Sequence, residues 1–208
     1  MHVGVQLIIQ QIYDCGKMKR GMSEMFDIYE ECPQYSSGLV SLRKTVAEDA
    51  RELLKCYSDL EAVPFFNSDN CHGDDFHYET IERMLQAIEF WNFSYNNRYF
   101  VRWTVSLNTT GEKVGTAEMF HRLAEDEFNH YGVLRIDLQS RCETREIIGD
   151  ILNIARNHFY TAFEVKKMLT KAVPEASQRI LALTEAGFTP LDKKLMTYDH
   201  YFWAKMPE

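Results

Sequence analysis

The 208-residue chain contains few cysteines, and they follow no pattern that would indicate a bridge or a metal site. The five are odd in number, widely scattered and without CxxC spacing: Cys15, Cys32, Cys56, Cys71 and Cys142. A secreted disulfide framework uses an even and closely spaced set, so this usage is typical of reduced thiols. We therefore expect a cytoplasmic protein.

Long apolar runs are also missing. The most apolar N-terminal stretch, Val3–Ile12, is interrupted by glutamines, and no basic segment precedes it. A membrane-spanning helix needs about 20 apolar residues, and a signal peptide begins with positive charge. We expect neither kind of segment, and no membrane partner.

The chain also lacks an excess of positive charge. Lys and Arg total 23 against 31 Asp and Glu, which gives a formal net charge of −8. Because phosphate backbones are bound by basic surfaces, nucleic acid is not expected as the main partner. The hydrophobic content of 45% and the charged content of 26% are those of an ordinary globular domain.

The chain divides into a short N-terminal part and one longer domain. Residues 1–37 are predicted to be a helical appendage, and residues 38–208 the domain proper. The predicted strands span residues 38–44, 99–107, 113–121, 133–138, 167–173, 195–197 and 200–205. The predicted helices run from a capping box at Thr45–Glu48 to Tyr57, over 80–95, over 145–163, and from Pro174 to a Gly187-Phe188 end.

The stretch Gly132–Phe188 carries the most chemical information. An apolar strand, Val133–Leu138, feeds a polar turn and then a helix that begins at Arg145. This arrangement aims backbone N–H groups and the positive end of the helix dipole at one point, which suits a phosphate or pyrophosphate group. The turn lacks the glycines that allow a backbone to approach such a group closely.

The order of elements over residues 39–206 resembles that of the GNAT acetyltransferase superfamily. Leu39–Asp49 is similar to the family's opening strand and helix cap, Glu112–Thr116 to the turn before a central strand, and Glu185–Phe188 to the end of the last helix. The resemblance implies a mixed α/β (α+β) fold. Its central mixed, mostly antiparallel sheet would be flanked by helices on both faces.

The resemblance also implies a reaction. A GNAT enzyme is an N-acetyltransferase that moves the acetyl group of acetyl-CoA, its co-substrate, to a primary amine by direct attack. The expected partners are acetyl-CoA and a small-molecule or protein amine acceptor, and a homodimer is compatible with the family.

The family's pyrophosphate motif, Q/R-x-x-G-x-G/A, matches this chain only in part. Over Arg141–Glu146 it places Thr144 and Glu146 where the small residues belong, and a second register over Gln139–Thr144 also lacks glycine. Glu143 and Glu146 would repel a pyrophosphate, whereas the arginines would attract it. The resemblance assigns cofactor binding to the backbone of the strand and to the turn: Leu134, Ile136, Leu138, Arg141, Thr144 and Arg145.

Catalytic candidates follow from what acetyl transfer needs, a base for the amine and an acid for the leaving thiolate. Glu118, on the strand 113–121, is our first candidate for the base, with exposure on an alternating strand as the structural alternative. Tyr198 is the candidate acid, although it could equally be a packing aromatic, as could Tyr201. Asp137 and His121 are further candidates for the base. Alternatively, Asp137 could have a structural role, in an ion pair with Arg102 or Arg135.

The family's Asn early in the last helix and Tyr near its end correspond here to Ala176 and Leu183. These losses, with the missing glycines, favour an alternative function, that of a catalytically inactive GNAT-fold domain that binds a ligand or a protein. The arginines at the turn weigh against this alternative. A third interpretation, an oligomeric interaction module, would use residues 1–37.

The loop Asn67–His77 is rich in groups that can bind metals, namely Cys71, His72, His77 and three aspartates. The two histidines lack a standard zinc spacing, so a polar turn that caps the next helix is the stronger interpretation, and no metal is expected. The resemblance to the GNAT superfamily places this loop between the first two helices, which implies that it shapes the acceptor pocket. Its acidic residues would suit a cationic amine.

Overall fold

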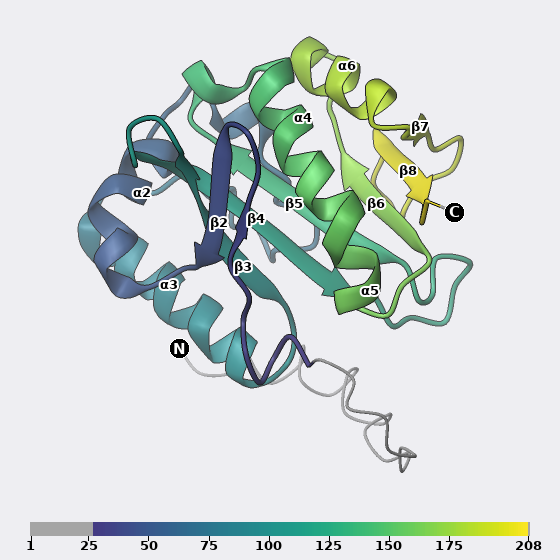
Figure 1. Cartoon of the computed structure of the whole chain (residues 1–208), viewed down its shortest axis with the longest axis horizontal. Helices are drawn as coiled ribbons and strands as arrows, with labels where there is room; N and C mark the ends of the chain where they lie inside the picture. The colour runs from purple at the N-terminus through teal and green to yellow at the C-terminus, as the bar shows by residue number, and fades with distance from the viewer. Residues whose placement is uncertain (1–26, 208) are drawn as a thin grey trace.

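The computed structural model describes residues 27–207, which fold around one eight-stranded sheet (Figure 1). The strands are β1 (Tyr35–Ser36), β2 (Val40–Lys44), β3 (Val101–Leu107), β4 (Lys113–His121), β5 (Gly132–Leu138), β6 (Lys167–Lys171), β7 (Thr189–Pro190) and β8 (Tyr201–Lys205). Their order across the sheet is β1-β2-β3-β4-β5-β6-β8-β7. Every neighbouring pair is antiparallel except β5 and β6, which are parallel.

The helices cover both faces of this sheet. They are α2 (Ala50–Tyr57), α3 (Ile81–Asn96), α4 (Arg145–Ile154), α5 (Tyr160–Ala162) and α6 (Ser177–Glu185). In Figure 1, α4 and α5 cross in front of the strands, whereas α2 and α3 lie behind them. The predicted fold class, a mixed and mostly antiparallel sheet between helices, is confirmed.

The two faces of the sheet differ in polarity because side chains alternate along each strand. Toward α4 the central strands present Val101, Trp103, Ala117, Met119, Leu134 and Ile136, which join one apolar core with Ile148 and Ile151. The opposite face presents buried polar groups to α2 and α3, namely Arg102, Thr104, Thr116, Glu118 and Asp137. The apolar face provides the main core, and the polar face holds the buried charged groups.

The predicted helix over 145–163 is interrupted. The chain leaves α4, makes a π-helical segment at Ala155–Phe159, and continues as α5. A π segment inserts a residue and rotates the side chains that follow. Here the Phe159 ring stacks on Trp103 with ring centroids 4.7 Å apart, so packing against the sheet accounts for the interruption.

The predicted capping box at Thr45–Glu48 is wrong by one residue. The backbone N–H of Val46 donates to the Asp49 carboxylate at 3.1 Å, so Asp49 and not Glu48 closes the box. Asp49 is fully buried and also accepts from Arg43 and from the Thr104 hydroxyl. These contacts with the rest of the fold place Asp49, rather than Glu48, at the closing position of the box. Thr45 also bonds Thr104 on the neighbouring strand.

Other differences from the predicted elements are small. The strand predicted at 195–197 is a single bridge between Leu195 and Tyr198, and the short β1 and β7 were not predicted. Of residues 1–37, the described part lies against the sheet: Ile28 is buried in the main core and β1 pairs with β2. The helical appendage predicted over residues 1–37 lies largely outside the described residues, and the division at 37/38 stays a prediction. Among residues 27–207 we find no helix with the length and apolarity needed to cross a bilayer.

Gly115 permits a close approach between two central strands. A Cβ at this position would lie 2.0 Å from the carbonyl oxygen of Asp137 on β5. We expect Gly115→Ala to lower the free energy of unfolding by about 1–3 kcal/mol, since the backbones must separate. Urea denaturation measures this change. Gly149→Ala in α4, where no atom lies within 4 Å of the new Cβ, is the matched control and should stabilise by about 0.5–1 kcal/mol; equal effects at both sites would contradict the argument.

Asp49 should make stability depend on pH. Burial alone would raise the pKa of Asp49, but hydrogen bonds from Arg43, Val46 and Thr104 outweigh burial and hold it below the ordinary value. A lowered folded-state pKa gives stability that is present above about pH 4, the unfolded value, and is lost as the pH falls through the folded value. We expect Asp49→Asn to lower stability at pH 7 and to flatten its decline in acid. Parallel curves of unfolding free energy against pH for the two proteins would contradict this.

Candidate active site

Arg102 lies at the centre of the polar face. Its side chain is buried and donates to Glu118 Oε2 at 2.5 and 3.0 Å and to Asp137 Oδ2 at 3.0 Å. It also donates to the hydroxyls of Tyr57 at 2.8 Å and Thr116 at 3.1 Å. Burial opposes its charge, but the adjacent carboxylate of Glu118, with Asp137, raises the pKa of Arg102 well above its usual range.

The strand register brings these groups together. Arg102 pairs with Glu118 across β3 and β4, and Glu118 pairs with Arg135 across β4 and β5. Residues directly opposite each other on antiparallel strands point to the same face. Glu118 Oε1 therefore accepts from Arg135 at 3.0 Å, and the carboxylate lies between two guanidinium groups.

Glu118 is 1% exposed, so the sequence alternative of a solvent-exposed strand residue is wrong. Its Oε2 accepts two N–H groups of Arg102, whereas its Oε1 accepts one from Arg135. A carboxylate oxygen has room for two hydrogen bonds. Oε1 thus keeps one acceptor position.

Asp137 has the structural role that the sequence offered as an alternative. Its Oδ2 accepts from Arg102 and from Tyr57, while its Oδ1 has no hydrogen-bond partner among the described residues. Burial raises the pKa of Asp137 above the ordinary carboxyl value, against the opposing effect of Arg102. Asp137 does not line the cavity described next.

A cavity of about 540 Å³ lies over this network, between the sheet, α3 and the loop that joins α2 to α3. Aromatic rings dominate its walls, and Arg102, Glu118 and Arg135 reach it from the sheet. The lining residues are Asn70, Cys71, His72, Asp74, Phe76, Tyr78, Arg83, Ala87, Phe90, Trp91, Ser94, Tyr99, Phe100, Arg102, Glu118, Phe120 and Arg135. Glu118 is thus the predicted base that the structure places at a cavity.

The loop 67–77 forms one wall of the cavity. Asp74 accepts from the Phe76 N–H at 2.9 Å and pairs with Arg83 on α3, and Asp75 accepts from the His77 N–H at 2.9 Å. These are turn and ion-pair contacts. No group of three His, Cys, Asp or Glu side chains in the described part of the chain is arranged to hold a metal ion.

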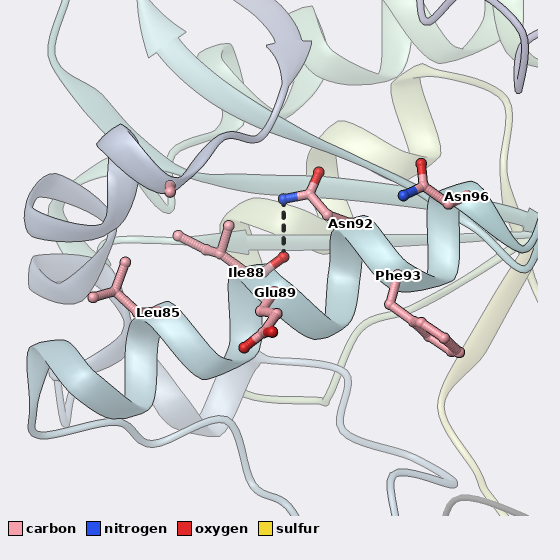
Figure 2. A pocket seen from close by; sticks show the side chains of 7 residues that line it. Leu85, Ile88, Glu89, Asn92, Phe93 and Asn96 are labelled. Carbon is pink, nitrogen blue, oxygen red and sulfur yellow. Dashed lines mark hydrogen bonds between the residues drawn. The ribbon is translucent and has the colours of Figure 1, made fainter.

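A second hollow of about 540 Å³ lies along α3 (Figure 2). Figure 2 shows Glu89 and Phe93 projecting from one side of this helix and Asn92 and Asn96 from the other, with the Asn92 amide bonded to the Ile88 carbonyl. None of the predicted site residues lines this hollow. It is therefore not part of the candidate active site.

The predicted cofactor strand has an open edge. β5 pairs with β6 only over Gly132–Leu134, although it continues to Leu138. The segment Phe65–Asn70 lies beside this opening: the Asp69 carbonyl oxygen accepts from Arg135 and its carboxylate pairs with Lys171 on β6. Of the predicted residues, Ile136 and Leu138 lie on the open part of this edge, whereas Leu134 is paired with Thr170 of β6.

The other predicted cofactor residues meet at the start of α4. Thr144 caps the helix by accepting from the Ile147 N–H at 3.4 Å. Arg141 pairs with Glu112, and Arg145 pairs with Glu185, both at 2.5 Å. Sequence reasoning missed Arg179 on α6, which is buried and paired with Glu143. Since 36 residues separate these two, no local pattern could have indicated their contact.

The remaining catalytic candidates lie apart from Glu118. The Tyr198 hydroxyl accepts from the Asn70 N–H at 2.9 Å, so it reaches the rim residue Asn70 but does not line the cavity. Tyr201 is buried and donates to Asp69 at 3.1 Å. His121 points to the opposite face of β4 and lies 2.9 Å from the His130 ring nitrogen.

Comparison with solved structures identifies the architecture. No protein-family model matches the sequence, and a comparison with curated proteins gives no significant match. A GNAT-family acetyltransferase from Bacillus anthracis matches 85% of this chain and all of its own, with a TM-score of 0.64 and 11% identity. The chain has the GNAT fold.

Two further structures support this assignment of the GNAT fold. RimJ from Mycobacterium smegmatis, solved with CoA-disulfide, matches 81% of this chain and 86% of its own, with a TM-score of 0.65 and 13% identity. A ribosomal-protein-S5-alanine acetyltransferase of Vibrio fischeri matches 84% of this chain and 97% of its own, with a TM-score of 0.59 and 14% identity. At such identities the likeness shows the GNAT fold, and the reaction has to be argued from the site.

Arg102 should be essential for stability. Arg102→Met would leave Glu118 and Asp137 buried beside each other with less compensation, and removal of one partner from a buried ion pair costs about 3–5 kcal/mol. Urea denaturation at pH 7 measures this loss. Arg145→Met, which removes an arginine from a half-exposed pair, should cost at most about 1 kcal/mol. Similar losses in the two variants would contradict the central role of Arg102.

Proposed function

We propose that this GNAT-fold protein is an N-acetyltransferase that moves the acetyl group of acetyl-CoA to a primary amine bound in the cavity over Glu118. The observation that carries the proposal is the position of Glu118. It is a buried carboxylate with one open acceptor position, on the wall of an aromatic cavity and one strand away from the open edge of β5.

The residues at the β5 edge and the start of α4 fit acetyl-CoA in part. Backbone groups of Leu134–Leu138 can hold an extended chain as an added strand would, whatever the side chains are. Thr144 begins the helix whose positive end favours an anion, and Arg141 and Arg145 are paired only at the surface, where such pairs are weak. When bound there, acetyl-CoA would supply an activated acyl group.

The chain's own residues would then handle the protons. Glu118 Oε1 would accept the proton of the attacking amine, while Arg102 and Arg135 hold the carboxylate in place. Tyr198, which uses its hydroxyl oxygen to accept from Asn70, keeps its own proton available to a leaving thiolate. Burial raises the pKa of the Cys71 thiol, so the cysteine of the cavity is a poor nucleophile and direct attack is favoured.

The lining of the cavity also indicates which kind of amine acceptor would bind there. Its loop aspartate, Asp74, is bonded to Arg83 and Tyr78, so it is already neutralised rather than free to attract a cationic amine. The walls offer mainly aromatic surface. An amine with a sizeable apolar body therefore suits the cavity better than a highly charged polyamine.

Calorimetric titration of the purified protein with acetyl-CoA, with CoA for comparison, is the first test. We expect micromolar binding and, with an apolar amine present, release of CoA. Failure to bind at millimolar concentration would overturn the proposed reaction and favour the inactive ligand-binding or protein-interaction alternative.

Glu118→Gln tests the base. General-base catalysis contributes about 10²–10⁴ to a rate, so we expect turnover to fall at least about 100-fold while the acetyl-CoA dissociation constant stays the same. Asp74→Asn, which changes another cavity carboxylate to its amide, is the matched control and should keep most of the activity. Undiminished turnover in Glu118→Gln would remove this residue from the mechanism.

A further inference from the structure

A buried ion pair lies beside the predicted pyrophosphate turn. Arg179, on α6, donates through Nε and a terminal nitrogen to the two oxygens of Glu143, at 2.6 and 2.7 Å. Both side chains are nearly inaccessible, at 2% and 7% exposure. The third nitrogen of Arg179 donates to the Phe65 carbonyl oxygen at 3.1 Å.

The turn supplies further hydrogen-bond donors, which the chain itself satisfies only in part. The Ser140 N–H donates to the Asp59 carboxylate at 2.8 Å. The Gln139 side chain is 6% exposed, and its amide nitrogen has no hydrogen-bond partner within residues 27–207. Glu143 immediately precedes Thr144, the cap of α4. The turn therefore combines a buried guanidinium–carboxylate pair, a helix start and, at Gln139, an amide donor without a partner in the described part of the chain.

We propose that the Glu143 carboxylate occupies a phosphate position of the cofactor site, and that Arg179 is the phosphate-binding residue, held by Glu143 until a ligand displaces it. The identity of the ligand as the pyrophosphate of CoA rests on the proposed function. Binding is an exchange of one anion for another on the same guanidinium.

The exchange is chemically reasonable because carboxylate and phosphate both bind a guanidinium through two parallel hydrogen bonds. A buried arginine cannot be left without a partner, so Arg179 needs an internal anion whenever no ligand is present. Glu143 provides that anion. This gives a reason for an acidic residue in a turn that would otherwise attract pyrophosphate.

Arg179 also connects the turn to the acceptor cavity. It bonds Phe65, and the same loop continues through Asp69 to Asn70 and Cys71, which line the cavity. Asp69 fastens the loop to Lys171 and Tyr201. A change of partner at Arg179 therefore acts on a loop that forms the cavity wall.

Titration with CoA of the Glu143→Gln variant tests the exchange. This substitution keeps the shape of the side chain but removes its charge, so we expect the CoA dissociation constant to fall about tenfold and the melting temperature of the free protein to fall. Glu112→Gln is the matched control. It changes the net charge equally and frees a surface arginine, Arg141, and we expect at most a twofold change.

The expected gain in CoA affinity must depend on Arg179. In the double variant Glu143→Gln/Arg179→Met, which removes both charges of the pair, we expect the tightening to disappear. An affinity of Glu143→Gln that is unchanged or weaker for both CoA and pyrophosphate, or an equal gain in the double variant or in Glu112→Gln, would overturn the proposal.

Inorganic pyrophosphate separates this proposal from the proposed function. If Glu143→Gln tightens pyrophosphate binding while no form of the protein binds CoA, the anion exchange is supported and the acetyltransferase function is overturned. If the unmodified protein binds CoA and acetylates an amine while Glu143→Gln gains affinity for neither CoA nor pyrophosphate, the exchange is overturned and the reaction is supported.

Discussion

The burial of Arg102 is the constraint on which the rest of the polar face depends. A guanidinium in a low-dielectric interior requires anions within hydrogen-bond distance, and β4 and β5 supply them as Glu118 and Asp137. Those carboxylates in turn need cations, so Arg135 joins at Glu118. The antiparallel register of three strands fixes all four charges on one face, and a slip of one residue would move them into the apolar core.

This network explains why one face of the sheet is closed by packing and the other borders a cavity. The face under α4 is closed by packing, as the stack of Trp103 on Phe159 illustrates. Under α3 the Trp91 ring lies over the Arg102 guanidinium, and the Cζ atom of Arg102 is 4.4 Å from the ring centroid. That contact joins helix to sheet while the aromatic side chains around it leave a cavity. The proposed base is thus rigidly held but still reaches an open space, as preorganised catalysis requires.

Much of the fold could be predicted from the sequence, because alternation, turn residues and helical periodicity are local properties. The strand 113–121 and the helix starting at Arg145 were predicted at their observed positions. The predictions that were wrong or incomplete depend on distant partners. Asp49 closes the helix cap because Thr104 and Arg43 meet it there, and the pairing of Arg179 with Glu143 joins α6 to the turn before α4 across 36 residues of chain. For the site, the sequence indicates Glu118 as a candidate base but does not show that two arginines hold its carboxylate.

The turn after β5 departs from the GNAT pattern in composition, yet its charges follow a consistent arrangement. Each arginine near the turn has an acidic partner within the chain: Arg141 with Glu112, Arg145 with Glu185, and Arg179 with Glu143. The first two pairs are exposed, so water and salt already weaken them and an arriving anion loses little by breaking them. The third is buried, where an ion pair is strong and neither partner can be left alone. The net charge of −8 would oppose any anionic ligand at a distance, so the proposed binding at this turn would have to come from short-range contacts, and the buried pair is the contact that would control it most.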